Sequence, residues 1–279
     1  METWRLLPFK IANAFENMAM DEALFRVLQE QGGPPVLRFY GWEKPSLSVG
    51  YSQDLRDGIN LRYCRQSGID VVRRPTGGKA VLHDRELTYA VVSREKPPFT
   101  PAGLIRNYQA IGLCLIRGFS ALGIDVRMAG DKPGNEKDVI KNRRPVCFAV
   151  PAPFELLSRG RKICGSAQVR SRGCFLQHGS ILLEFDGAMN GLVFANPHDL
   201  GNDCPGDDME SRITSVRAET GASIEAETLS AVMERAFLDV WNIRFMEGEP
   251  TMKEQELKKD LMRNKYTNPS WNEGPFGSS

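Results

Sequence analysis

The chain has 279 residues, of which 41% are hydrophobic and 25% are charged, and its formal net charge is +1. These values are typical of a globular protein with one large domain, and so small a charge provides no field that would attract nucleic acid or an anionic membrane. No apolar run approaches the roughly 20 residues of a membrane-spanning helix, and the N-terminus lacks the basic and apolar regions of a signal peptide. We therefore expect a cytoplasmic protein.

The six cysteines and three histidines show no spacing typical of a disulfide framework or a metal site. No two cysteines form a CxxC pair, and three histidines are too few for a His-rich site. Free thiols in a reducing compartment fit this pattern. We expect no disulfide, no metal ion and no cofactor.

Apolar periodicity and turn residues predict the elements of the first half of the chain. In chain order they are a helix over 13–31, strands over 36–40 and 47–51, a short helix from Asn60 to Gly68, strands over 71–73, 80–83 and 87–93, and a helix from Thr100-Pro101 to Gly123.

The same signals predict the second half. It has a strand over 124–128, a surface loop over 129–145, a hairpin of 154–157 and 161–169 turning at Arg159-Gly160, a strand over 174–185, an irregular stretch over 190–211, a helix over 225–241, and a last helix from the Thr251/Glu254 capping box to about Tyr266. Strands mixed with a few helices indicate an α+β fold, with mixed, largely antiparallel sheets flanked by helices.

One stretch, residues 71–84, combines a β-branched pair, two arginines, a Pro-Thr-Gly-Gly turn and a second apolar run. Gly77 and Gly78 have no side chain, so a ligand can lie directly on their backbone, and both tolerate positive φ. The simpler interpretation of the Gly-Gly pair alone is a tight hairpin turn with solvated arginines. The turn amides and three flanking cations suit an anion or a carbonyl oxygen, the cations being Arg73, Arg74 and Lys79.

A second stretch makes the pattern more specific: Gly160-Arg161-Lys162 is followed by Gly165-Ser166-Ala167-Gln168. Together with residues 73–78 and His83-Asp84, in this order, it resembles the lipoate–protein ligase/octanoyltransferase superfamily. The likeness runs from the N-terminal helix to about Val216, and more loosely to the end. It implies the catalytic fold of biotin and lipoate protein ligases over 1–248, with a C-terminal helix over 249–271 packed on it. Residues 272–279 are polar and Gly-rich, and we expect them to form a disordered tail.

In that superfamily the Gly-Gly turn and the lysine line a tunnel for a medium-chain acyl group. The resemblance therefore implies that Gly77 and Gly78 form part of the tunnel wall and that Lys162 meets the acyl carbonyl. It implies further substrate contacts from Arg73, Thr76, His83, Gly165, Ser166, Ala167 and Gln168.

Two chemistries occur in the superfamily. Its ligases activate free lipoate with ATP, need no cysteine and usually carry an extra C-terminal domain, whereas its transferases take octanoyl from acyl carrier protein through a cysteine thioester. After Trp241 the chain has room for about one helix and a tail, not for a further domain of typical size. Arg144-Pro145-Val146-Cys147-Phe148 resembles the nucleophile segment of the LipM-type octanoyltransferases, which precedes the lysine hairpin. The resemblance thus favours an octanoyltransferase with Cys147 as its nucleophile.

A cysteine suits this reaction, because a thiolate attacks a thioester at little free-energy cost and its own thioester is open to an amine. Thiols are mostly protonated at neutral pH unless a cation is near. An ammonium about 4 Å away favours the thiolate by a few kcal/mol and can also stabilise the developing oxyanion. The hypothesis is a dyad of Cys147 and Lys162.

Cys164 is the rival nucleophile. It lies two residues from Lys162 and, in a regular strand, on the same face. We nevertheless expect it to be a small apolar residue of the strand. Nothing in the sequence assigns a role to Cys204. Three further cysteines lie in apolar-patterned elements and are expected in the core: Cys64, Cys114 and Cys174.

Two histidines lie in or near these motifs. We expect His83 to hydrogen-bond a loop, and the alternative is that it helps to protonate the leaving thiol. His178 lies in a predicted strand and is expected to be structural rather than a base.

The resemblance implies octanoyl-acyl carrier protein as the donor and a lysine of a lipoyl domain as the acceptor, with the glycine cleavage H protein the expected one. We expect a monomer that binds neither nucleic acid nor membrane. Three alternatives stay open: an ATP-dependent lipoate–protein ligase, an octanoyl amidotransferase between lipoyl domains, and an acyl- or biotinyl-type binding module without catalysis. The position of the cysteine ahead of Lys162 disfavours the amidotransferase, which only a panel of donors can distinguish.

Overall fold

The computed structural model describes residues 1–56, 58–95, 104–130, 154–195 and 209–274. Its centre is a mixed eight-stranded sheet. The strands lie in the order β11 (Arg244–Glu247), β1 (Thr3–Ala12), β2 (Val36–Trp42), β6 (Glu86–Arg94), β10 (Cys174–Leu182), β9 (Arg161–Ser171), β8 (Leu156–Ser158) and β7 (Val126–Met128). β1 is parallel to both of its neighbours and every other pair is antiparallel, which confirms the predicted α+β class.

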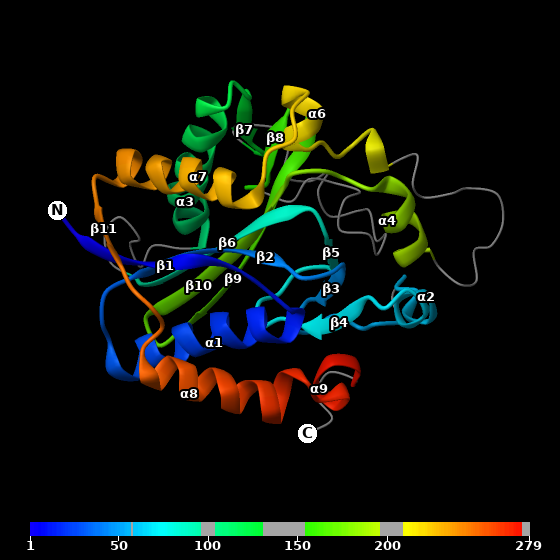
Figure 1. Ribbon diagram of the computed structural model, residues 1–279, viewed down its shortest axis with the longest axis horizontal. Helices are drawn as coiled ribbons and strands as arrows, with labels where there is room; N and C mark the ends of the chain where they lie inside the picture. The colour runs from blue at the N-terminus through cyan, green and yellow to red at the C-terminus, as the bar shows by residue number, and fades with distance from the viewer. Residues whose placement is uncertain (57, 96–103, 131–153, 196–208, 275–279) are drawn as a thin grey trace.

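Helices cover both faces of this sheet (Figure 1). Two of them pack on one face and two on the other: α3 (Leu104–Ala121) with α7 (Ala226–Trp241), and α1 (Ala14–Gln31) with α8 (Met252–Leu261). Successive strand residues point to opposite faces, so β2 contributes Leu37 and Phe39 to the α3/α7 core and Val36 and Tyr40 to the α1/α8 core. None of the helices in the described ranges has the length and apolar character needed to cross a bilayer.

Local signals in the sequence explain where several elements begin and end. The Asn13 side chain accepts a hydrogen bond from the backbone of Glu16 and caps α1, and Thr251 and Glu254 form both halves of a capping box at α8. The β8–β9 hairpin turns through two left-handed residues, Arg159 (φ 49°) and Gly160 (φ 82°), which suits a two-residue hairpin. These starts and this turn are confirmed as predicted.

A second sheet carries the Gly-Gly stretch. Its three strands lie in the order β4 (Asp70–Arg73), β3 (Ser46–Val49) and β5 (Val81–His83). Its apolar residues share a third buried cluster with α2 (Leu61–Gln66) and α4 (Gly187–Val193). Thr76 in the turn between β4 and β5 lies 2.7 Å from His178 of β10, so the turn packs against the large sheet.

Some elements differ from the predictions. β1 and β11 were not predicted. α4 was missed too: it begins at Gly187, where Asp186 caps it by accepting from the backbone of Met189, and it continues into the stretch expected to be irregular. Short α6 (Val216–Thr220) was missed as well. The predicted helix start at Thr100-Pro101 and most of the predicted 129–145 loop lie outside the described residues.

The C-terminal region also differs. After α8 the chain continues as a π-helical turn over Met262–Tyr266, and a further helix, α9, spans Pro269–Glu273. A disordered tail was expected from residue 272, yet Asn272 is 4% exposed and its Oδ1 accepts the backbone N–H of Arg73 at 3.0 Å. The expectation does not hold for residues 272–274, because this hydrogen bond docks α9 on β4.

Candidate active site

The Gly-Gly turn is held against a neighbouring loop by direct backbone contact. A Cβ atom on Gly50 would lie 1.8 Å from the carbonyl oxygen of Gly78, so only glycine fits at position 50. The backbone of Tyr51 donates to the carbonyl of Thr76 at 2.9 Å. Gly77 and Gly78 themselves are exposed, with Gly78 at φ 95°. The turn thus presents bare backbone on a rigid support.

The arginines beside the turn are buried, so the interpretation of solvated arginines is wrong. Arg73 is 3% exposed, and one of its nitrogens, Nη1, donates to three carbonyl oxygens, those of Gly50, Tyr51 and Gln53. Its Nε donates to the carbonyl of Trp271 in α9 at 3.0 Å. The guanidinium is committed to the fold, and we assign Arg73 a structural role in place of the expected substrate contact.

Arg74 shapes the turn from within. Its Nη2 donates to the carbonyls of Gly77 at 2.7 Å and Lys79 at 2.8 Å, and its Nε donates to Thr76 Oγ1 at 3.1 Å. A Cβ on Gly78 would come within 2.8 Å of the same Nη2. The turn therefore requires glycine at position 78 both for its φ and for the space that Arg74 takes.

A buried polar chain links the turn to α1. Thr76 Oγ1 lies 2.7 Å from Nε2 of His178, and His178 Nδ1 lies 2.9 Å from Asp21. Burial lowers the pKa of His178, and Asp21 opposes this only in part. A neutral ring facing a carboxylate carries its proton on Nδ1, so Nε2 accepts from Thr76. Asp21 also accepts from Arg38 at 2.8 Å and from the Tyr40 hydroxyl.

His83 is enclosed by partners in the same way. Its Nδ1 lies 2.8 Å from Glu86 Oε1, its Nε2 lies 2.7 Å from Ser48 Oγ, and its ring stacks on Trp42 with centroids 4.0 Å apart. Both nitrogens are occupied by side chains of the small sheet and β6. This geometry favours the structural role over proton transfer to a leaving thiol.

Lys162 is a buried lysine at the start of β9. It is 7% exposed, and its Nζ donates to Glu155 Oε1 at 2.5 Å. A Cβ on Gly165 would lie 2.7 Å from Cε and 2.8 Å from Nζ of Lys162, so the side chain lies across the backbone of Gly165. The hairpin and this glycine together fix the position of the amine.

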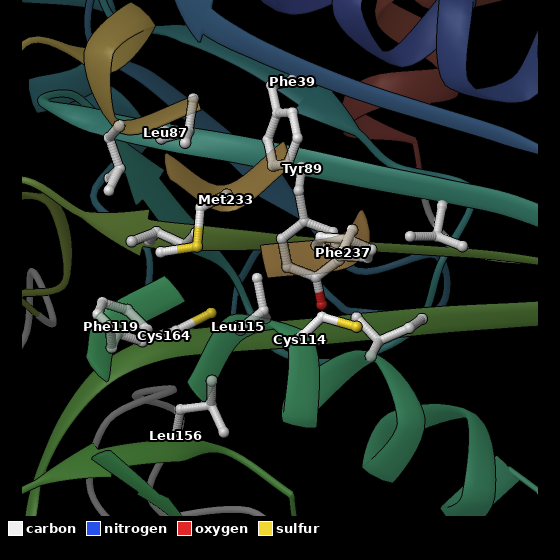
Figure 2. Close-up of a cluster of buried hydrophobic side chains, with 14 of the residues drawn as sticks. Phe39, Leu87, Tyr89, Cys114, Leu115, Phe119, Leu156, Cys164, Met233 and Phe237 are labelled. Carbon is white, nitrogen blue, oxygen red and sulfur yellow. The ribbon is translucent and has the colours of Figure 1, made fainter. Parts of the chain in front are cut away.

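Cys164 lies on the opposite face of β9 from Lys162. The pairing with β8 shifts between Leu156↔Cys164 and Leu157↔Lys162, which makes Ile163 an extra residue, a β-bulge. Ile163 and Cys164 consequently both join the α3/α7 core, where Figure 2 shows Cys164 beside Leu115 and Phe119. The expectation that Cys164 shares a face with Lys162 is wrong, because the bulge breaks the alternation.

Burial also makes Cys164 a poor nucleophile. It raises the pKa of the thiol to about 12, and the lowering effect of Lys162 does not compensate. A thiol with this pKa is almost entirely protonated at neutral pH. The other cysteines expected in the core are buried as well: Cys64, Cys114 and Cys174. Cys147 and Cys204 lie outside the described residues.

The predicted lining residues of β9 divide between the two faces of the sheet. Gly165 and Ala167 lie on the side of Lys162, with Ala167 paired to His178. Ser166 and Gln168 point to the α3/α7 side, where Ser166 Oγ lies 2.7 Å from the Tyr89 hydroxyl. Both amide atoms of Gln168 are buried without a hydrogen-bond partner within the described chain.

Sequence reasoning missed two parts of this site. Glu155 was read only as a hairpin residue, although in a hairpin that turns at 159–160 it is a diagonal neighbour of Lys162, whose direct partner is Leu157. Asp21 was read only as part of a helix, and a charged residue at the centre of an apolar helix face was the signal that marked it as buried.

Comparison with known proteins agrees with this geometry. The family model of the lipoyl protein ligase A/B catalytic domain matches residues 13–238. The octanoyltransferase LipM of Kyrpidia tusciae is 38% identical over 272 residues, covering 98% of this chain and 99% of that protein. The LipM of Bacillus subtilis is 36% identical and covers 97% and 98%.

Solved structures similar to this chain are lipoate-protein ligases. A lipoate-protein ligase A bound with ATP has a TM-score of 0.80 and 28% identity, and the similarity covers 99% of this chain and 100% of that one. The bi-partite lipoate protein ligase of Thermoplasma acidophilum, described with its E2 lipoyl domain, has a TM-score of 0.82 and 25% identity over 100% and 99%.

Proposed function

Because the chain belongs to the lipoyl protein ligase A/B catalytic-domain family and has the activity of an octanoyltransferase in protein lipoylation, we propose that the octanoyl group travels through a thioester on Cys147. The donor is octanoyl-acyl carrier protein and the acceptor is a lysine of a lipoyl domain, with the glycine cleavage H protein first among candidates. The enzyme acts as a cytoplasmic monomer and needs neither ATP nor a cofactor.

The reaction has two halves. The Cys147 thiolate attacks the donor thioester, a C–S bond to Cys147 forms, and the phosphopantetheine thiolate leaves and takes a proton. The acceptor amine then attacks the new thioester, the C–N bond of the amide forms, the C–S bond breaks, and the sulfur of Cys147 takes a proton, which regenerates the free thiol. Lys162 stabilises the thiolate and the oxyanion in both halves, because an ammonium acts strongly in a buried site.

One observation supports this role above the others: Lys162 is buried and held in place by Glu155 and Gly165. A lysine withdrawn from water loses hydration, and proteins keep one there only with a partner or a task. The bare backbone of the Gly77-Gly78 turn lies beside the same sheet and suits the wall of an acyl tunnel. We propose that Thr76 and Gly165 also line this tunnel.

The acyl-enzyme tests the proposal directly. We expect the enzyme incubated with octanoyl-acyl carrier protein, without ATP, to gain the mass of one octanoyl group, mapped by peptide mass spectrometry to Cys147. Cys147→Ser should abolish the adduct and lower turnover by more than about 10³-fold, and Lys162→Met should slow loading by about 10²-fold, the size of a lost oxyanion donor.

Cys164→Ala is the matched control, since it removes a thiol from the same hairpin on the other face. It should retain the adduct on Cys147 at some cost in stability. Loss of the adduct in Cys164→Ala alone would mean that the nucleophile is misassigned. A second donor, an octanoylated lipoyl domain, distinguishes an octanoyltransferase from an amidotransferase. We expect this donor to load Cys147 more slowly than octanoyl-acyl carrier protein does.

A further inference from the structure

Only one of the two carboxylate oxygens of Glu155 has a hydrogen-bond partner among the residues that the structure describes. Oε1 accepts from Lys162, whereas Oε2 is buried and has no hydrogen-bond partner in the part of the chain that the structure describes. The side chain is 9% exposed. Leaving a buried oxygen without a donor is unfavourable, and in native proteins such an atom is explained by a ligand, an ion or a water.

The backbone around Glu155 is held in place. The carbonyl of Glu155 accepts from the backbone of Ala129 at 2.8 Å, and the backbone of Phe154 donates to the carbonyl of Ala129 at 3.2 Å. The Phe154 ring stacks on Tyr108 of α3 with centroids 5.8 Å apart. A loose backbone therefore does not explain why Oε2 lacks a partner.

The transfer half of the proposed reaction lacks a proton acceptor. A lysine side chain reaches the enzyme as an ammonium, with a pKa of about 10.4 in water, and must lose a proton before its nitrogen can attack. Forming an amide from an ammonium releases two protons, and the departing sulfur of Cys147 takes only one.

Among the residues that the structure describes, three titratable groups are recorded as interacting with Glu155: Lys162, Tyr108 and Cys164. Burial raises the pKa of both Tyr108 and Cys164 to about 12, so both are neutral acids at neutral pH. Lys162 is itself a donor to the carboxylate. Within this group Glu155 is the base.

We propose that Glu155 is a catalytic residue of the transfer half and that its Oε2 receives the ε-ammonium of the acceptor lysine. This inference rests on the proposed function. Oε2 takes one proton from the ammonium, the neutral amine attacks the thioester carbonyl, the C–N bond forms and the C–S bond breaks with its electron pair on sulfur. The second amine proton passes to that sulfur. Ammonium, carboxylate and thioester become amide, carboxylic acid and thiol, with no net charge left over.

Charge repulsion in the site favours this proton transfer. The incoming ammonium meets the ammonium of Lys162, and repulsion between like charges lowers the pKa of the incoming ammonium. The Lys162–Glu155 pair thus serves both halves of the reaction, Lys162 through its charge and Glu155 through its second oxygen.

The test measures the two halves separately. Wild-type enzyme, Glu155→Gln and Glu155→Asp are loaded from octanoyl-acyl carrier protein, and single-turnover transfer to apo-H protein is followed by mass spectrometry from pH 6 to 9.5. Glu219→Gln is the matched control: this carboxylate is 2% exposed and pairs at 2.9 Å with Arg161, the residue before Lys162, rather than with the amine of Lys162.

Because Glu155 also holds Lys162, we expect Glu155→Gln to slow loading as well, and to slow transfer at pH 7 about 10²-fold more than it slows loading, the usual contribution of a general base. The defect should shrink above pH 9, where solution supplies free amine. Glu155→Asp should recover at least about tenfold of the loss, because it keeps a carboxylate, and Glu219→Gln should match wild type in both halves.

Equal slowing of loading and transfer in Glu155→Gln, or a defect of the same size at every pH, would mean that Glu155 only holds Lys162 and would overturn the inference. If Glu155→Gln does not fold, the pH dependence of transfer by the wild-type enzyme decides. A transfer rate nearly independent of pH supports a base within the enzyme. A transfer rate that falls tenfold for each unit by which the pH is lowered rejects such a base. Absence of any adduct on wild-type Cys147 would instead refute the proposed function.

Discussion

The absence of a side chain at position 165 decides where the amine of Lys162 lies. A Cβ there would approach Cε and Nζ of the lysine to 2.7 and 2.8 Å. Because the end of a lysine is flexible, we expect Gly165→Ala to fold with a melting temperature within about 3 °C of wild type. The displaced amine should lower turnover at least about tenfold, since misplacement by about 1 Å can cost 10²-fold.

Turnover with octanoyl-acyl carrier protein and thermal unfolding are the two measurements for this variant. Gly248→Ala is the control, because nothing lies within 4 Å of a Cβ at that position. Wild-type turnover in Gly165→Ala would show that the position of the amine does not matter for catalysis.

Individual residues of the site were predictable to different extents. The Gly-Gly turn and Lys162 could be predicted because each belongs to a short motif, and a short motif consists of residues that are neighbours in the sequence. Arg73 was assigned to the substrate because its main partner, α9, lies 198 residues away and leaves no local signal. The sequence could not predict that Lys162 and Cys164 lie on opposite faces of β9, because a bulge adds one residue without changing the composition of the strand.

The small helix α9 contributes more than its length suggests. Asn272 accepts from the backbone of Arg73 and donates to the carbonyl of Tyr266, so it joins α9 to β4. Through Arg73 the same contact reaches the loop that supports the Gly-Gly turn. We expect Asn272→Ala to lower the free energy of unfolding by about 1–3 kcal/mol, since it leaves buried polar groups unpaired, and to raise the KM for the donor.

Urea denaturation and steady-state kinetics measure these two effects. Ser270→Ala, an exposed position on the same helix, should change the stability by no more than about 0.5 kcal/mol. A KM for the donor that is the same in Asn272→Ala and wild type would show that α9 does not influence donor binding.

At the level of elements, prediction succeeded where the signal was local. Helices with caps and a regular apolar stripe, such as α1 and α7, and the hairpin at Arg159-Gly160 were found close to their true bounds. β1 was missed because Pro8 and the exposed Ile11 interrupt its alternation. Its place in the sheet comes from pairing with β2 and β11, which no window of sequence contains.

At the scale of the whole molecule, a buried ion pair of Arg38 and Asp21 links separate elements of the fold. Their side chains are 7% and 0% exposed. The pair connects α1 to the centre of the large sheet, and Asp21 continues to His178 and the Gly-Gly turn. Arg38→Met would leave a buried carboxylate without its cation, so we expect a loss of about 3–5 kcal/mol in the free energy of unfolding.

Chemical denaturation followed by far-UV circular dichroism measures this loss. Arg235→Met is the control: that side chain is 76% exposed and pairs with Asp239 at 3.1 Å on α7. An exposed pair of this kind contributes about 0–1 kcal/mol. A loss in Arg38→Met as small as in the control would mean that the buried pair does not hold α1 to the sheet.

The pairing of β1 with β11 has a consequence for how the protein is made. Thr3 pairs with Arg244, so β1 lacks one neighbour until residue 244 and the rest of β11 have been translated. An open strand edge can recruit other chains, and contacts this distant in sequence form slowly. Expression at lower temperature or with a chaperone that shields nascent strands should therefore raise the yield of native enzyme, without any change in the final fold.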